Sequence, residues 1–261
     1  MIFRVFRERT EAALEFLGFG TRALLAIPGV CIHRGSEVVR QFERVIWGSL
    51  PIVVVGGLSV GLVTWLQTRR MLVTYGIEST LPSILAAAIL VETGPMLAAL
   101  MVAGKMGAGL GAELGSMVLT EEVDALEVLG APAIPTLVAP RAMACGLAVP
   151  FLTVILGAAA LLGGLLAELA GGEMTAQIYG QKSLLFLKLS DVIPATLKTS
   201  VFGLLTGLTG CWAGLKADRS AESVGKAATR GVVWSMAGVF AANVAIVPLL
   251  QAGVVAIGWT G

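Results

Sequence analysis

The run Val45–Thr68, VIWGSLPIVVVGGLSVGLVTWLQT, decides what kind of protein this chain forms. It holds no charged residue and is bounded by Arg44 and Arg69. A helix needs about 20 apolar residues to cross roughly 30 Å of hydrocarbon, so this run is long enough to span a bilayer. Its apolar residues are continuous rather than alternating, which predicts a helix and not a strand of a barrel.

Four more stretches between charged residues reach the same length, with Glu92 alone inside one and Lys198 alone inside another. The composition agrees, because 56% of the chain is hydrophobic and 13% is charged, against about 25% charged in soluble domains. We therefore expect an all-α membrane protein of one domain, residues 1–261. Its spans are expected at residues 46–67, 80–104, 142–167, 192–215 and 232–257.

Residues 1–45 are too interrupted by charge and by proline to form a signal peptide or a span. Apolar residues near helical spacing predict an amphipathic helix at the membrane interface, and a helix packed on its own bundle is an equal alternative. These apolar residues are Phe3, Phe6, Ala13, Leu14 and Leu17. Thirteen Lys and Arg fall in the segments on the N-terminal side of the membrane and four on the other. This excess predicts a cytoplasmic N-terminus and a C-terminus on the opposite side.

Several classes of function are disfavoured by the composition. A net charge of +1 argues against nucleic-acid binding. Three cysteines without a CxxC pair and a single histidine, His33, indicate neither a disulfide framework nor a metal site. Gly57 to Gly61 match the G-x-S-x-G pattern, yet they lie inside a span without a histidine partner, so helix packing is the better interpretation. We predict no catalytic residue, no metal and no cofactor bound by this chain.

Residues 105–140, between the second and third spans, carry two patterns. Gly107, Gly111 and Gly115 recur at four-residue spacing, which exposes backbone on one helix face. This face predicts close helix contact within the chain, or less readily between two copies. A short acidic helix follows, with Thr120 as the expected N-cap and Gly130 as its stop. Such a helix either docks a soluble subunit or is a solvated loop helix.

The same region resembles the MlaE-type permease family. The resemblance rests on Glu92-Thr93-Gly94-Pro95, Ala103-Gly104-Lys105, Ala112-Glu113-Leu114-Gly115-Ser116-Met117, Thr120-Glu121 and Asp124-Ala125-Leu126-Glu127-Val128. It covers nearly the whole chain, although Lys105 stands where the family more often has Arg and Glu122 where Gln is frequent. The family consists of membrane subunits of ABC transporters that move phospholipids between the membranes of Gram-negative bacteria and plastids.

The resemblance implies a homodimer in the bacterial inner membrane with two cytoplasmic ATPase subunits. It also implies a periplasmic MCE-domain protein and, in some systems, a STAS-domain protein. Because the chain has no Walker A motif, ATP and Mg²⁺ are expected in the ATPase partner. The family's coupling helix would correspond to residues 120–129. The residues expected to couple to the ATPase are Thr120, Glu121, Glu122, Asp124, Leu126 and Glu127.

Glu92 and Lys198 are candidate functional residues because an ionisable group inside a span costs a few kcal/mol. Gly94 and Pro95 are expected to kink the helix beside Glu92. We hypothesise that Glu92 and Lys198 pair where a lipid headgroup passes; snorkelling is the alternative for Lys198. Five more residues near the outer end of the first span are candidates for lining a lipid path or for interface anchoring. They are Leu62, Trp65, Leu66, Arg69 and Tyr75.

Three other classes of function compete with a lipid permease. A self-sufficient secondary transporter would use Glu92 as its ion-coupling carboxylate, although no internal repeat is evident. A membrane scaffold would transport nothing. An intramembrane protease lacks a credible Ser/His pair. An ATPase partner held by the acidic helix separates the permease from the first two. The lipid species and the direction of transport are not encoded in these patterns.

Overall fold

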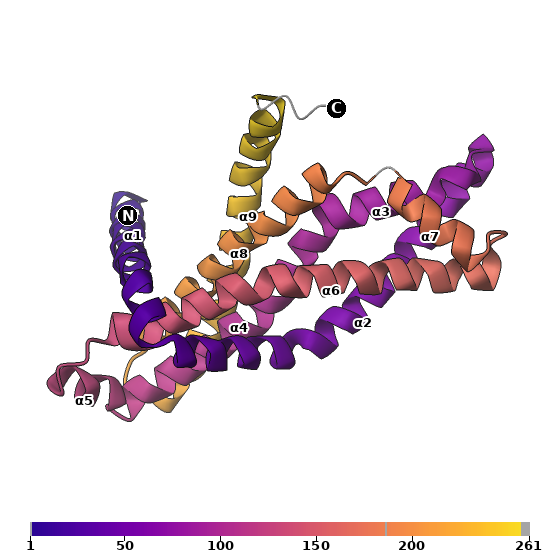
Figure 1. Cartoon of the computed structure of the whole chain (residues 1–261). Coiled ribbons are helices and arrows are strands. Elements are labelled where there is room, and N and C mark those ends of the chain that lie inside the picture. The colour runs from indigo at the N-terminus through magenta and orange to yellow at the C-terminus, as the bar shows by residue number, and fades with distance from the viewer. Residues whose placement is uncertain (1, 186, 257–261) are drawn as a thin grey trace. The chain divides into compact units, whose positions relative to one another are not determined.

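The computed structural model describes the backbone of residues 2–185 and 187–256, and the side chains of residues 11, 14–30, 34–185 and 187–249. The described residues form helices joined by short turns (Figure 1). In chain order these are α1 (Ile2–His33), α2 (Gly35–Tyr75), η1 (Glu78–Thr80), α3 (Leu81–Ala88), η2 (Ile89–Thr93), α4 (Gly94–Leu119), α5 (Glu122–Val128), η3 (Ile134–Val138), α6 (Ala139–Gly171), α7 (Ala176–Leu185), α8 (Leu189–Leu215) and α9 (Ala221–Ala256).

Within the described residues, five helical stretches are long and apolar enough to cross a membrane, which confirms the expected fold class. They are Gly35–Tyr75, Glu78–Leu119, Ile134–Gly171, Leu189–Leu215 and Ala221–Leu249. The first helix of this set begins at Gly35 rather than near residue 46, because no helix-breaking residue separates the charged stretch from the apolar run. The short helix α7 was not expected from the sequence, since its ten residues are too few and too polar to look like a span.

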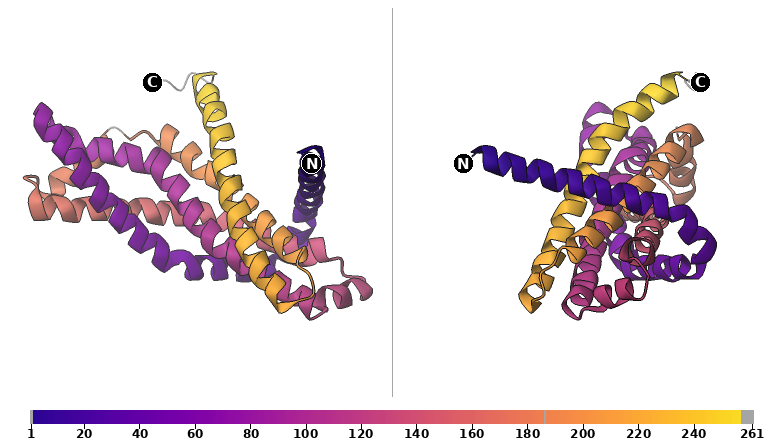
Figure 2. Two further views of the ribbon diagram at one scale, coloured as in Figure 1. Left: turned by 180° about the vertical axis from the view of Figure 1, so that it is seen from behind. Right: turned by 90° about the vertical axis from the view of Figure 1, so that its left-hand side faces the viewer.

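The chain divides into two compact units, each described here by itself. The first unit consists of Met1–Val45, Ala103–Gly146 and Gly203–Gly238. The second unit consists of Ile46–Val102, Leu147–Phe202 and Val239–Gly261. The continuous course of the long helices can be followed from two further directions in Figure 2.

Small residues hold the first unit together. A Cβ added at Gly107 would lie 2.7 Å from the carbonyl oxygen of Gly231 on α9, and one at Gly111 would lie 2.6 Å from that of Ala227. The glycine face of α4 therefore packs against α9 within the chain, as the four-residue spacing predicted. A buried hydrogen bond of 2.7 Å between the hydroxyls of Thr209 and Ser235 joins α8 to α9.

Backbone contact between α2 and α6 organises the second unit in the same way. A Cβ on Gly61 would collide with the carbonyl oxygen of Ala160, and one on Gly163 with that of Leu58. The glycines of the G-x-S-x-G pattern thus bring two helices together, and Ser59 donates its hydroxyl to Val55 in its own helix. Beside this contact lies an apolar core formed by Trp65, Leu72, Leu81, Leu85, Ile89, Ala160, Ala167 and Tyr179.

Candidate functional site

Glu92, Lys198 and Asn243 form a polar triad in the second unit. Lys198 on α8 places its ammonium nitrogen 2.6 Å from Oε2 of Glu92. Asn243 on α9 donates its side-chain amide to the other carboxylate oxygen, Oε1, at 2.9 Å. The ion pair expected from the sequence is therefore present, and an amide from a third helix completes it.

A π-helical turn, η2, presents Glu92 to this triad. The turn occupies Ile89–Thr93 and is followed directly by Gly94 and Pro95. Pro95 has no backbone N–H to donate, so the α-helical bonding pattern fails one turn earlier and a wider turn replaces it. The kink expected beside Glu92 takes this form, and π turns inside α-helices are frequent at functional sites.

The two charges of the triad differ in their surroundings. The Lys198 side chain is 2% exposed, whereas that of Glu92 is 46% exposed. An ammonium group as buried as Lys198 requires a compensating anion, which Glu92 supplies. Because the carboxylate is only half covered, the triad also presents a polar, hydrogen-bonding surface to whatever occupies the space beside it. Glu92 can therefore contact a ligand without leaving Lys198.

The expected lining residues of α2 divide between two environments. Leu62 and Leu66 are 41% and 46% exposed. Trp65 is 3% exposed and donates its indole N–H to Glu168 Oε2 at 2.7 Å. Trp65, a candidate for lining the lipid path, is therefore turned away from any open face of α2, because a buried carboxylate on α6 accepts its indole N–H. Only the two leucines are open to a lipid.

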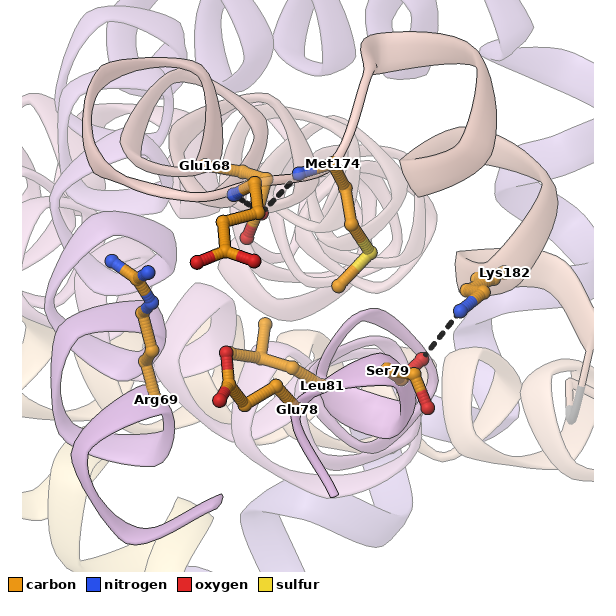
Figure 3. Close-up of a pocket in the computed structure, with 8 residues that line it drawn as sticks. Arg69, Glu78, Ser79, Leu81, Glu168, Met174 and Lys182 are labelled. Atoms are coloured by element: carbon orange, nitrogen blue, oxygen red, sulfur yellow. Dashed lines mark hydrogen bonds between the residues drawn. The ribbon is translucent and has the colours of Figure 1, made fainter. Parts of the chain in front are cut away.

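Arg69 and Tyr75 lie at the end of α2 in different settings. The guanidinium of Arg69 sits 5.2 Å from the centre of the Trp65 ring and donates to the carbonyl oxygen of Gly171. Arg69 also lines a pocket near η1 and α7, described below (Figure 3). Tyr75 is exposed and is the last residue of α2. The structure does not bring Tyr75 into the polar triad.

The acidic segment between α4 and α6 forms the short helix α5. Thr120 is not its N-cap, which corrects the sequence prediction: the cap is Glu121, in the left-handed conformation at φ 61° and without a side-chain capping bond. The Thr120 hydroxyl lies 2.8 Å from Oε1 of Glu122 and 3.2 Å from the Ser116 carbonyl oxygen of α4, and it accepts no backbone N–H of α5. Gly130, at φ 78°, follows the helix as expected.

The acids of the predicted coupling segment are only partly free. Arg219, in the turn before α9, pairs with Glu121 at 3.0 Å and also with Asp124. Glu122 and Glu127 are exposed, and Glu122 accepts a hydrogen bond from Thr120. Leu126 is half-buried.

The most open apolar side chains of this segment were not singled out from the sequence. Val128 and Leu129 are 87% and 81% exposed at the end of α5. An apolar tip next to exposed acids can fit a partner surface better than acids alone.

A second charge network in the first unit was also missed. Arg141 on α6 is buried and donates to Glu113 on α4 at 2.7 Å and to the Leu137 carbonyl at 2.8 Å. Arg44 on α2 reaches the same carboxylate at 3.2 Å. One acid thereby links three helices. Glu113 belongs to the sequence block that carries the family resemblance, which is the signal that marks it.

Metal binding has no support in the described part of the chain, where no three His, Cys, Asp or Glu side chains form a group that could hold an ion. Cys145 and Cys211 are buried free thiols. The predicted amphipathic residues Phe3, Phe6 and Ala13 lie outside the described side chains, as does His33. Leu14 and Leu17 are exposed on α1.

Comparison with known proteins assigns this architecture to a class. The family described as Permease MlaE matches residues 38–249. A probable ABC transporter permease protein of Rickettsia typhi is 32% identical over 215 residues, which are 82% of this chain and 83% of the relative. A probable ABC transporter permease protein of Synechocystis is 33% identical over 207 residues, or 79% of each chain.

A plant relative carries a lipid in its name. The chloroplast protein TRIGALACTOSYLDIACYLGLYCEROL 1 of Arabidopsis thaliana is 31% identical over 207 residues, covering 79% of this chain and 59% of that protein. Together with five membrane-length helices, these relatives define a multi-pass permease subunit of the ABC transporter class. The chain belongs to the MlaE permease family.

Proposed function

We propose that this permease moves phospholipid, and that the polar triad meets the lipid headgroup on its way. The observation that carries the proposal is the half-exposed carboxylate of Glu92, held by the buried Lys198 and by Asn243. A carboxylate and an amide are suited to hydrogen bonding a polar headgroup, and exposed Leu62 and Leu66 are suited to acyl chains. The name of the plant relative contains a glycolipid built on diacylglycerol, which supports a lipid as the substrate and leaves phospholipid as our proposal.

The energy source proposed is ATP hydrolysis in a separate subunit. The chain carries no Walker A motif, so nucleotide and Mg²⁺ would bind to the partner. Helix α5 would be the contact, with Val128 and Leu129 entering an apolar groove on the ATPase. Arg219 holds the first turn of α5 to the turn before α9. Movement of α5 would therefore be transmitted to that turn directly.

We further propose the assembly that the family resemblance implies. Two copies of the chain would enclose the lipid path in the inner membrane, with the N-terminus and α5 on the cytoplasmic side and the C-terminus on the periplasmic side. An MCE-domain protein would receive or deliver lipid on the periplasmic side. A STAS-domain protein would bind the ATPase where the organism encodes one. The charge asymmetry of the loops supports this orientation.

Reconstitution tests the proposal. The chain is purified with its co-eluting ATPase, placed in proteoliposomes, and assayed for ATP-dependent transfer of a fluorescent phospholipid to acceptor vesicles. Wild type should transfer lipid, and Glu92→Gln should lower transfer about tenfold while ATPase binding is retained. Conversely, Val128→Asp with Leu129→Asp should release the ATPase, and Leu184→Asp, at an exposed leucine of α7, serves as the matched control.

Two results would contradict the proposal. Lipid transfer that is equal in wild type and Glu92→Gln would remove the triad from the lipid path. A chain that never co-purifies with an ATPase, and that instead moves an ion in a Glu92-dependent way, would establish a secondary transporter in its place.

A further inference from the structure

A second polar pocket lies in the second unit, where α2, η1, α6 and α7 meet (Figure 3). Its volume is about 160 Å³. A cavity of about 150 Å³ is large enough to hold a ring of six heavy atoms such as benzene. Five of its eight lining side chains are charged, so the pocket is suited to a polar ligand and not to an acyl chain. These five are Arg69, Glu78, Glu168, Glu173 and Lys182.

None of the five charged side chains forms an ion pair within the described part of the chain. The two basic groups are directed at backbone carbonyls: Arg69 donates to Gly171, and Lys182 donates to Ser79 at 3.1 Å. A guanidinium has five N–H donors and an ammonium has three, so both retain donors. Figure 3 shows Arg69 and Lys182 on opposite sides of the pocket, with Glu78 between them.

Glu168 gives the pocket a fixed acidic wall. Its side chain is 2% exposed. Its Oε1 accepts the backbone N–H groups of Glu173 and Met174, both at 3.1 Å, while Trp65 donates to Oε2. A carboxylate has about four acceptor sites, and these three donors leave one open.

The chain beside Glu168 is shaped to hold this carboxylate. A Cβ on Gly172 would collide with Glu168 Oε1, so only glycine leaves the space that the acid occupies. Glu168 thus accepts three hydrogen bonds and has no ion-pair partner among the described side chains. A cationic ligand in the pocket can add a charge-assisted hydrogen bond at the open acceptor site.

We propose that this pocket binds the headgroup of an amine-bearing phospholipid, as a site separate from the Glu92 triad. The ammonium group of the lipid donates to Glu168 and to Glu78 or Glu173, and its phosphate accepts from Arg69 or Lys182. Three acids and two bases match a zwitterion with one charge of each sign better than a purely anionic lipid. The inference rests on the proposed function, because it places a lipid beside the membrane end that is expected to face the periplasm.

Headgroup chemistry provides the first test. Glycerophosphoethanolamine, glycerophosphocholine and glycerophosphoglycerol are titrated separately onto the detergent-purified complex, with saturation-transfer NMR as the readout. The ethanolamine compound should bind at least fivefold more tightly than the other two, because a trimethylammonium group cannot donate a hydrogen bond and glycerol carries no cation. Equal binding of all three compounds would overturn the proposal.

Matched variants place the binding in the pocket. Glu78→Gln with Glu173→Gln removes two charges from partly open side chains and should weaken binding of the ethanolamine compound about tenfold. Glu222→Gln, which breaks an exposed pair with Lys226 elsewhere in the chain, should leave it unchanged. An equal loss in the Glu222 control would assign the effect to overall charge and refute the site.

Nanodiscs distinguish a membrane lipid from a free headgroup compound. The complex is placed in nanodiscs that contain equal amounts of phosphatidylethanolamine and phosphatidylcholine, and native mass spectrometry identifies the lipid that stays bound. The wild-type complex should retain phosphatidylethanolamine, and the Glu78 and Glu173 double variant should lose it. Preferential cross-linking of a partner protein's lysine into the pocket would instead identify a protein docking site. If ATP-driven lipid transfer persists while no headgroup preference is found, only this inference fails. If headgroup binding is found without transfer, only the transport function fails.

Discussion

The ammonium group of Lys198 lies 2.6 Å from the carboxylate of Glu92, although 106 positions separate the two residues. Each is an isolated charge in its own span, and each compensates the charge of the other. Asn243 adds a hydrogen bond from α9. Three membrane helices therefore converge on one carboxylate, and the free energy of that contact can be measured.

The two partners of this pair should not be equally costly to remove. Glu92→Gln leaves the buried Lys198 ammonium without an anion, and breaking a buried pair costs about 3–5 kcal/mol. We expect the lower end of this range, since Glu92 is half exposed. Lys198→Met leaves only the half-exposed carboxylate and should cost less. A thiol-reactive fluorogenic dye reports thermal unfolding as the buried Cys145 and Cys211 become accessible.

A charge exchange provides the control for that comparison. Glu92→Lys combined with Lys198→Glu should recover part of the stability that either reversal loses alone. No recovery in the double variant would show that the surroundings, and not the pair, determine the cost.

Gly61→Ala should destabilise the protein, because its Cβ would collide with the carbonyl oxygen of Ala160 on α6. Inserting an atom into such a contact typically costs about 1–3 kcal/mol. Gly238→Ala is the matched control: nothing lies within 4 Å of its added Cβ, so it should be neutral or stabilising by up to about 1 kcal/mol. The dye assay ranks the two variants, and equal melting temperatures would mean that α2 and α6 separate freely.

Arg219→Glu should impair coupling more than stability. Its pairs with Glu121 and Asp124 are exposed, and such pairs contribute about 0–1 kcal/mol each. The amount of lipid transferred per ATP hydrolysed should nevertheless fall severalfold, because α5 loses its attachment to the turn before α9. Lys226→Glu, at another exposed pair, should leave the ratio intact. Restoration by adding Glu121→Arg would establish the ion pair as the cause, whereas a proportional loss of ATPase binding would refute the coupling role.

The hydroxyl of Tyr179 should ionise at a higher pH than that of an ordinary tyrosine. Burial raises the pKa of its hydroxyl to about 12 from an ordinary value near 10. Because the folded state holds the proton more tightly, this residue's contribution to stability is complete below about pH 10 and is lost as the pH rises toward 12. The chain has two tyrosines, so Tyr75→Phe leaves Tyr179 alone in an ultraviolet titration of tyrosinate. An unshifted ionisation in that variant would show that the hydroxyl reaches solvent.

The sequence was most informative about features that carry a high energetic cost and are therefore rare. An isolated charge in a span is costly, so Glu92 and Lys198 were recognisable, and their pairing is confirmed. Glycines at four-residue spacing predicted the contact of α4 with another helix for the same kind of reason. The described residues likewise contain the expected five helices of membrane-crossing length, which hydrocarbon thickness makes recognisable in a sequence. The roles of these residues in lipid binding stay predictions.

The missed features depend on which side chains meet in space. Glu168 ends an apolar stretch and resembles an ordinary boundary residue in the sequence, but it captures the indole of Trp65 and so draws that ring inward. Thr120 has the residue type of an N-cap, yet its hydroxyl lies beside the Glu122 carboxylate and the Ser116 carbonyl oxygen. Asn243 was visible as a polar residue in a span, but only the fold shows that it donates to Glu92.

The π turn at Ile89–Thr93 has a consequence for the register of the helix. An i→i+5 turn accommodates one residue more than an α-helical turn, and each residue of an α-helix corresponds to about 100° of rotation. Deleting one residue from this turn would restore a regular α-helix and rotate the faces of α3 and α4 against each other by roughly that angle. The single extra residue thus changes the rotational register of the helix. With this register, Ile89 lies in the apolar core while Glu92 faces Lys198.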